Sequence, residues 1–119
     1  MIFKGICRKF SLKNEDQYNT IGAFWEEMEA KYGLESLRGL GLHWSGDTML
    51  YAIGLKDGEI KDYNLKIALP DDGWTSVDGE TENLKEIYDE IYLGGALDFE
   101  IETFYENGKC NILYYRKNK

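Results

Sequence analysis

The same order of predicted elements occurs twice in this chain, and this repetition limits the fold more than any single motif does. In the first half, a strand-like stretch at residues 6–12 precedes an amphipathic segment and two short apolar runs separated by a turn at 45–47. In the second half, residues 63–69 precede another amphipathic segment and two runs separated by a turn at 106–108. We expect an α+β fold in which a duplicated β-α-β-β unit forms one antiparallel sheet, with two helices on one face and a ligand groove on the other.

Length and charge limit the classes of partner. The 119 residues, 43% of them apolar, predict a single domain spanning 1–119 with its own core and no room for an appended DNA-reading module. The balance of 22 acidic against 14 basic residues gives a formal net charge of -8, so we expect neither nucleic acid nor a membrane surface as a partner. Without a membrane-spanning run or a secretory leader, we expect a cytoplasmic location.

Cysteine and histidine usage predicts no metal site and no cofactor. Cys7 and Cys110 lie far apart without neighbouring thiols, so we interpret them as buried free thiols. His43 is the only histidine, which excludes multi-histidine metal sites. Any Ser-His or Cys-His catalysis would depend on this one side chain.

Two segments have apolar residues at helical spacing. The first has a stripe of Tyr18, Ile21, Trp25, Met28 and Tyr32, and the second a stripe of Leu84, Ile87, Tyr88 and Ile91. Gly33 and the glycine pair at 94–95 are expected to end these helices. We interpret Trp25 and Tyr88 as core residues because they lie within the stripes.

A strand is predicted between the two helices. Residues 63–69 alternate apolar and polar side chains, and Pro70 ends the alternation. A turn at 71–73 then brings Trp74 to the margin of the sheet, before polar residues 78–80 lead to the second helix. Nothing periodic explains Trp74, so a position lining the groove and a position covering the core edge both stay open.

Two glutamates lie on the strand before the second hairpin turn. If residues 107–108 form a two-residue turn, Glu100 lies opposite Tyr115 and Glu102 shares its face. Both glutamates then point into the groove, while the more apolar opposite face packs on the helices. The alternative is that both glutamates lie on a solvated face of the sheet.

The register of the first hairpin is open. A count around residues 46–47 pairs Trp44 with Met49 and places Tyr51 on the same face. His43 then lies on the opposite face, among small residues that leave space, and we interpret it as a polar sheet residue. A slip of one residue would move Trp44 and Tyr51 to the groove side.

A carboxylate in a dry, aromatic groove has a specific chemical use. Desolvation raises the pKa of such a group unless a cation or several donors compensate. It can therefore anchor a cationic or donor-rich ligand, and tyrosine and tryptophan walls would add cation–π attraction of about 1 kcal/mol.

Taken in order, these features resemble the GyrI-like small-molecule (effector) binding domain family. The resemblance covers nearly the whole chain and rests on the strand-helix-hairpin repeat, on Leu69-Pro70 followed by Gly73-Trp74, and on the acidic strand at 98–102. It implies a duplicated fold whose central groove binds small hydrophobic or cationic molecules, with a glutamate of the penultimate strand at its floor.

Glu100 or Glu102 would have this anchoring role. Phe104 supplies the family's aromatic two residues after Glu102, whereas Tyr115 faces Glu100 in the count above. The candidate ligand-binding residues are Glu100, Glu102, Trp44, Tyr51, Trp74, Tyr115 and His43.

We therefore expect a stand-alone protein that captures hydrophobic or cationic xenobiotics or effectors. One alternative, also implied by the resemblance, is a hydrolase of strained-ring DNA-alkylating toxins that uses the same groove, with a glutamate as general base. Another is an acidic module that binds a basic protein. An exposed edge strand could support a homodimer.

Overall fold

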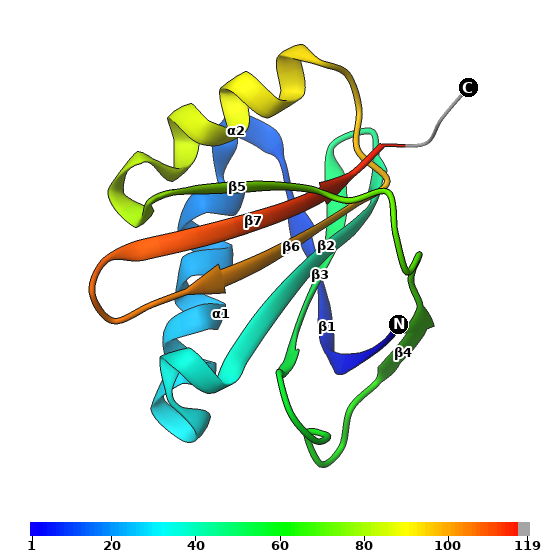
Figure 1. Cartoon of the computed structure of the whole chain (residues 1–119), viewed down its shortest axis with the longest axis vertical. Helices are drawn as coiled ribbons and strands as arrows, with labels where there is room; N and C mark the ends of the chain where they lie inside the picture. Colours follow the sequence, from blue (N-terminus) through cyan, green and yellow to red (C-terminus); the bar gives the residue numbers. More distant parts are fainter. Residues whose placement is uncertain (117–119) are drawn as a thin grey trace.

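The computed structural model describes residues 1–116, which form an α+β fold with one antiparallel sheet and two α-helices (Figure 1). The strands are β1 (Ile2–Ser11), β2 (Leu37–Ser45), β3 (Thr48–Leu55), β4 (Leu65–Ala68), β5 (Thr75–Glu80), β6 (Phe99–Phe104) and β7 (Lys109–Tyr115). The helices are α1 (Gln17–Tyr32) and α2 (Leu84–Leu93), with short 3-10 turns at Lys13–Glu15, Leu34–Ser36 and Thr81–Asn83. The expected α+β class, with one antiparallel sheet and two helices, is confirmed.

The seven strands lie in the order β4-β1-β3-β2-β6-β7-β5. At the centre, β2 and β6 pair antiparallel, with Gly41 opposite Glu100. Both helices cover the same face of the sheet, α1 over β1 and β3 and α2 over β5 (Figure 1).

Both predicted helices are present and end where glycine was expected to end them. Gly33 follows α1 with a φ of 84°, a left-handed backbone that glycine adopts without strain. Gly94 follows α2, and Gly95 has a φ of 117°. The stripe of α1 buries Trp25 and Met28 against the sheet.

The strand predicted at 63–69 has a different place from the one expected. The residues of this segment that form a strand, β4, pair with β1 at one edge of the sheet. The strand that precedes α2 and pairs with β7 is instead β5. Sequence patterning missed β5 because it is a polar edge strand, in which Ser76 and Asp78 both accept hydrogen bonds of 2.8 Å from Asn111.

The second hairpin has a longer turn than expected, and this changes which residues share a face. Tyr105 donates a backbone hydrogen bond to Lys109, so the loop has three residues and Gly108 takes a φ of 83°. Glu100 therefore pairs with Tyr114, not with Tyr115. The extra loop residue turns every side chain of β7 to the other face.

A bulge in β2 gives the first hairpin a register that differs by one residue from the expected one. The pairing of β2 with β3 shifts between Leu42 and Ser45, and His43 has a φ of 53° there. Gly41 pairs with Tyr51. Trp44 and Tyr51 thus both line the pocket on the face that carries the helices, whereas the alternative register placed them on a groove face away from the helices.

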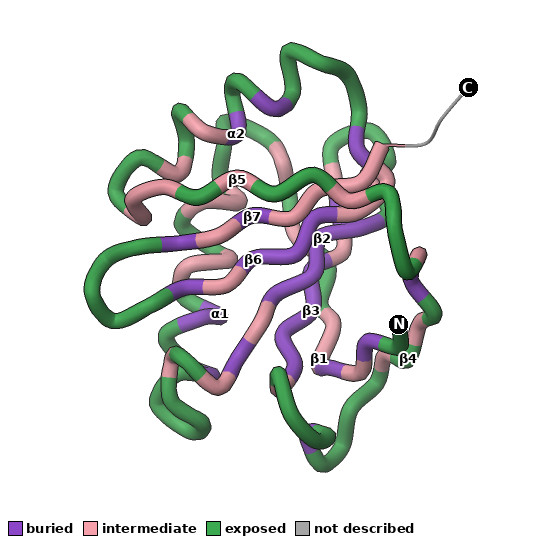
Figure 2. The backbone as a smooth tube through the Cα atoms, viewed as in Figure 1, coloured by how far each residue is buried: buried purple, intermediate pink, exposed green. Residues whose placement is uncertain are grey.

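The face away from the helices is also filled with side chains. Its buried cluster consists of Phe3, Leu40, Leu42, Ala52, Leu69 and Ile101. Trp74 packs on this cluster from the loop before β5. Burial is accordingly concentrated along the central strands (Figure 2). The expectation of an open groove on this face, with the helices packed on the face opposite the glutamates, is wrong.

Candidate ligand-binding pocket

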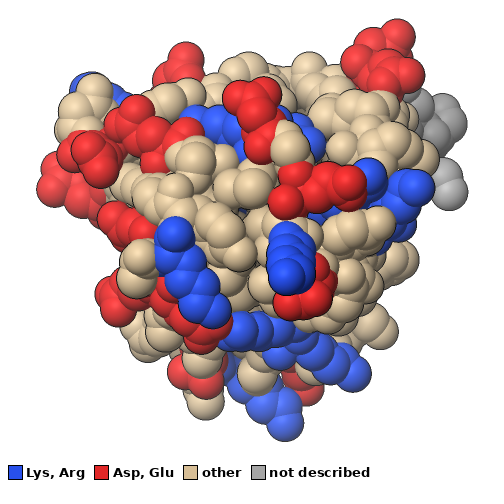
Figure 3. All heavy atoms as spheres, turned by 90° about the horizontal axis from the view of Figure 1, so that it is seen from below, with Lys and Arg blue, Asp and Glu red and all other residues tan. Residues whose placement is uncertain are grey.

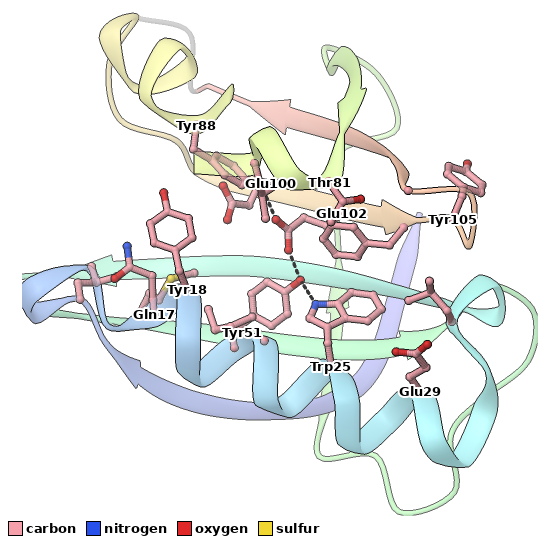
Figure 4. A pocket seen from close by; sticks show the side chains of 18 of the residues that line it. Gln17, Tyr18, Trp25, Glu29, Tyr51, Thr81, Tyr88, Glu100, Glu102 and Tyr105 are labelled. Carbon is pink, nitrogen blue, oxygen red and sulfur yellow. Dashed lines mark hydrogen bonds between the residues drawn. The ribbon is translucent and has the colours of Figure 1, made fainter. Parts of the chain in front are cut away.

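A pocket of about 480 Å³ lies between α1, α2 and the sheet, on the face that carries the helices (Figure 4). Its aromatic lining consists of Tyr18, Trp25, Trp44, Tyr51, Tyr88, Tyr92, Phe104 and Tyr105. Its acidic lining consists of Glu29, Glu100, Glu102 and Glu106. Among the residues described, no lysine, arginine or histidine lines it. The volume falls within the range of small-molecule sites.

Four of the seven candidate residues meet at this pocket: Glu100, Glu102, Trp44 and Tyr51. The other three do not. Trp74 and Tyr115 pack together on the opposite face, with ring centroids 5.6 Å apart, and the Trp74 indole donates to the carbonyl of Pro70. His43 is exposed at the bulge of β2. Trp74 therefore covers the core edge, one of the two positions left open.

Glu102 lies at the floor of the pocket within a buried hydrogen-bond network. Trp25 donates from Nε1 to the hydroxyl of Tyr51 at 2.8 Å, and Tyr51 donates to Oε1 of Glu102. Tyr88 donates to Oε2 of Glu102 at 2.5 Å. Each carboxyl oxygen thus has its own phenol donor (Figure 4). The network ties α1, β3, α2 and β6 together around one side chain.

Glu100 is buried to the same degree but is bonded more sparsely. Its side chain is 5% exposed, against 4% for Glu102. Among the described residues its hydrogen-bond partner is Tyr92, which donates to Oε2 at 3.2 Å. Glu100 is therefore the less compensated of two adjacent buried carboxyl groups.

Two glycines of β2 make room for these groups. A Cβ atom at Gly39 would lie 1.9 Å from the hydroxyl of Tyr51. One at Gly41 would lie 2.8 Å from Cγ and Oε1 of Glu100. Because real Cβ contacts are longer than this, side chains at either position would displace the network. These glycines are thus part of the pocket floor.

The surroundings shift the pKa values of the acidic and phenolic groups upward. Burial, followed by the charge of Glu102, holds the pKa of Glu100 well above its usual range. Burial also raises the pKa of Glu102, against the opposing hydrogen bonds from Tyr51 and Tyr88. Burial raises the pKa of Tyr18 to about 12. The pocket thus disfavours negative charge that no cation compensates.

Sequence reasoning assigned Trp25 and Tyr88 to the core alone and did not single out Tyr92. Trp25 and Tyr88 are in fact buried in the core, but they also line the pocket and belong to the Glu102 network. One sequence signal could have found these residues. A buried carboxylate needs O–H or N–H donors, and the apolar stripes of both helices contain tyrosines that can donate. Without the correct face for Glu102, that signal could not be used.

Removing single phenol hydroxyls should distinguish the two carboxyl groups by the stability that each hydrogen bond provides. Tyr88→Phe leaves Oε2 of Glu102 without its donor in a buried site, so we expect a loss of about 1–3 kcal/mol in the free energy of unfolding. Tyr92→Phe removes a longer bond from a residue 40% exposed and should cost less. Urea denaturation at pH 7 measures both, and equal losses would contradict the network described here.

The described residues contain no cluster of three or more histidine, cysteine or acidic side chains arranged to hold a metal ion. Cys7 and Cys110 are free, the first half-buried and the second buried. Within the same part of the chain, the helices lack the length and apolarity needed to cross a bilayer. Comparison with protein-family models, curated proteins and solved structures found no match.

Proposed function

We propose that the protein binds small hydrophobic or cationic molecules in the pocket between α1 and α2, with the buried glutamates of β6 as its acidic floor. The observation that carries this proposal is the pair Glu100 and Glu102, both at most 5% exposed, in an aromatic pocket whose described lining has no basic residue. Burial of uncompensated carboxyl groups is unfavourable, so a bound cation would relieve a cost that the empty protein carries.

We further propose that the chain is a GyrI-like effector-binding protein built from a duplicated unit. In support, the element order β1-α1-β2-β3 is followed by β5-α2-β6-β7. The strand order β1-β3-β2 also mirrors β6-β7-β5 about the centre of the sheet, with β4 as an addition at one edge. Glu100 and Glu102 lie on the penultimate strand, where the resemblance expects the anchor.

The aromatic lining suits a flat ligand. Tyr18, Tyr92 and Trp44 line the pocket together with the carboxyl groups, and a cation over an aromatic ring gains about 0.5–2 kcal/mol depending on its desolvation. Apolar contact with the same rings would hold the uncharged part of the molecule. A planar organic cation uses both kinds of contact at once.

Tryptophan fluorescence with the cationic dye proflavine tests this function. We expect saturable quenching that persists in Trp74→Phe, because Trp74 lies on the far face, and that weakens in Trp44→Phe, because Trp44 lines the pocket. In the double variant Glu100→Gln, Glu102→Gln the affinity should fall about tenfold or more, which corresponds to about 1.4 kcal/mol. No saturable response, or equal dependence on Trp74, would count against the pocket.

A second candidate is hydrolysis in the same pocket. The raised pKa of Glu100 favours it, because a buried carboxyl group with a raised pKa can act as a general acid or base. Product formation from a strained electrophile, followed by mass spectrometry, separates turnover from binding. For an acidic protein-binding module there is no comparable support: acidic and basic side chains share the face seen in Figure 3.

A further inference from the structure

The hydrogen bonds around the two carboxyl groups assign them different protonation states. Glu102 accepts one phenol proton at each oxygen, from Tyr51 and from Tyr88. The oxygen of Tyr51 already accepts the indole N–H of Trp25, which favours the orientation in which its own O–H points to Glu102. Phenol donors at both oxygens stabilise the ionised form of a carboxyl group, so Glu102 is assigned as the ionised member of the pair.

Glu100 has the opposite balance. It is 5% exposed, lies two residues from the charge of Glu102 on the same face, and receives one phenol bond of 3.2 Å. Two adjacent buried carboxyl groups without a cation retain one proton between them, and the group with fewer donors holds it. Glu100 is therefore the protonated member in the empty pocket.

Building on the proposed function, we propose that a cationic ligand enters by exchange for the proton of Glu100, while Glu102 stays ionised as a structural acceptor. The O–H bond of the Glu100 carboxylic acid breaks, its proton passes to solvent, and the carboxylate pairs with the incoming positive charge. The net charge of the pocket is then the same before and after binding. Glu100 is thus the residue that sets the preference for a cation.

The groups that face Glu100 from the elements around it support this exchange. They are Glu102 on β6, Tyr88 and Tyr92 on α2, Tyr18 on α1 and Tyr114 on β7. Basic side chains close to α2 have other partners. Lys85 binds Glu15 at 3.1 Å and Asp89 at 3.2 Å, and Arg116 stacks on Tyr114 and donates to the carbonyl of Ile91. Neither basic residue lines the pocket.

The unused hydrogen-bonding atoms indicate which kind of cation fits. Oε1 of Gln17, beside Tyr18 at one end of the pocket, is buried and has no partner among the described residues. Glu100 in its ionised form has one long hydrogen bond, from Tyr92 at 3.2 Å, and can accept more. Both groups are acceptors, so the ligand should bring N–H donors: a protonated amine or amidine fits, whereas a quaternary ammonium ion offers charge alone.

Calorimetry with three matched probes tests the exchange. We would titrate 1-naphthylmethylamine, its trimethylammonium analogue and neutral 1-naphthylmethanol at pH 7 in two buffers of different ionisation enthalpy. The amine should bind tightest and release close to one proton per molecule bound, and the neutral alcohol should release none. Glu26→Gln, which removes an exposed carboxylate of α1 outside the pocket lining, should leave the proton release unchanged.

The Glu100→Gln variant should lose the proton release. Because it is also expected to bind weakly, infrared spectroscopy of the ligand-free protein gives a second measurement. A protonated carboxyl band should be present in the wild type at pH 7, absent in Glu100→Gln, and lost from the wild type when the amine is added. Amine binding without proton release, or a band that disappears only in Glu102→Gln, overturns the exchange and leaves the binding function standing. No binding by any probe overturns the proposed function itself.

Discussion

Replacing Glu100 with glutamine is expected to make the empty protein more stable at pH 8 while weakening its affinity for cations. Glu100 binds its proton more tightly in the folded than in the unfolded protein, because burial and the charge of Glu102 raise its pKa when folded. The stability from this proton is complete below the ordinary pKa of 4.5 and is lost as pH rises towards the raised folded value. Glutamine is neutral at every pH and avoids that loss.

The size of the effect follows from the proton count. While the folded protein holds one proton that the unfolded chain has lost, the free energy of unfolding falls by about 1.4 kcal/mol per pH unit. We expect the wild type to approach this slope above pH 5 and Glu100→Gln to show a clearly smaller one. Glu102 contributes in the same direction, since its pKa is also raised, so the slope should not vanish.

Urea denaturation from pH 5 to pH 8 measures both slopes. Glu29→Gln is the matched control, because it removes one negative charge from the same pocket at an exposed position. It should change stability little and leave the slope intact. A wild-type protein that becomes more stable between pH 5 and pH 8, or a Glu29 variant with the larger effect, would show that Glu100 does not hold a proton in the folded state.

The expected gain in stability on removing the Glu100 carboxyl group indicates that this group is kept for function. A neutral or apolar side chain at Glu100 would fold at lower cost, since no cation lines the described pocket around it and its hydrogen bond from Tyr92 is 3.2 Å long. Side chains that carry an avoidable cost of this kind are expected at sites where activity requires them. A proton that leaves when a cation arrives gives the buried carboxyl group such a use.

The helices could be predicted from the sequence because their signal is local. The stripe from Tyr18 to Met28 and the glycine after Tyr32 depend only on spacing and on backbone freedom within one segment. The strand β5 could not be predicted in the same way. Its polar residues resemble a loop, and its pairing depends on β7, which lies far along the chain.

The pocket was placed on the wrong face because two small backbone irregularities each shift a register by one residue. The bulge at His43 and the three-residue loop ending at Gly108 both depend on positive φ angles that the sequence does not specify. The glutamates and Trp44 were still found as candidates, because their chemistry does not depend on register. Tyr115 was misplaced because its assignment rested on register alone.

Adding one methyl group at Gly39 should disrupt the floor of the pocket more than any other small substitution. A Cβ atom there would lie 1.9 Å from the hydroxyl of Tyr51, 2.6 Å from its Cζ and 2.9 Å from the ring of Trp25. Tyr51 is 1% exposed and its hydroxyl is held by two hydrogen bonds, from Trp25 and to Glu102, so it cannot easily move aside. We expect Gly39→Ala to reduce the free energy of unfolding by about 3 kcal/mol, the upper part of the range for overpacked cores.

Alanine substitutions at two other glycines, Gly41 and Gly22, provide matched controls for this prediction. Gly41→Ala meets the side chain of Glu100, which can shift into the pocket, so it should cost less stability than Gly39→Ala but should still weaken cation binding. Gly22→Ala on α1 meets nothing within 4 Å and should raise stability, by up to about 1 kcal/mol, through helix propensity. Urea denaturation and dye titration together distinguish the three variants.

A double variant shows whether the clash at Gly39 acts through the Tyr51 hydroxyl. Tyr51→Phe alone leaves Oε1 of Glu102 without a donor and should cost about 1–3 kcal/mol. Combined with Gly39→Ala, it removes the atom that the new methyl group would strike first, so the combined loss should be smaller than the sum of the two single losses. Additive losses would mean that the methyl group acts elsewhere, and that the space left by Gly39 does not serve the Trp25–Tyr51–Glu102 network.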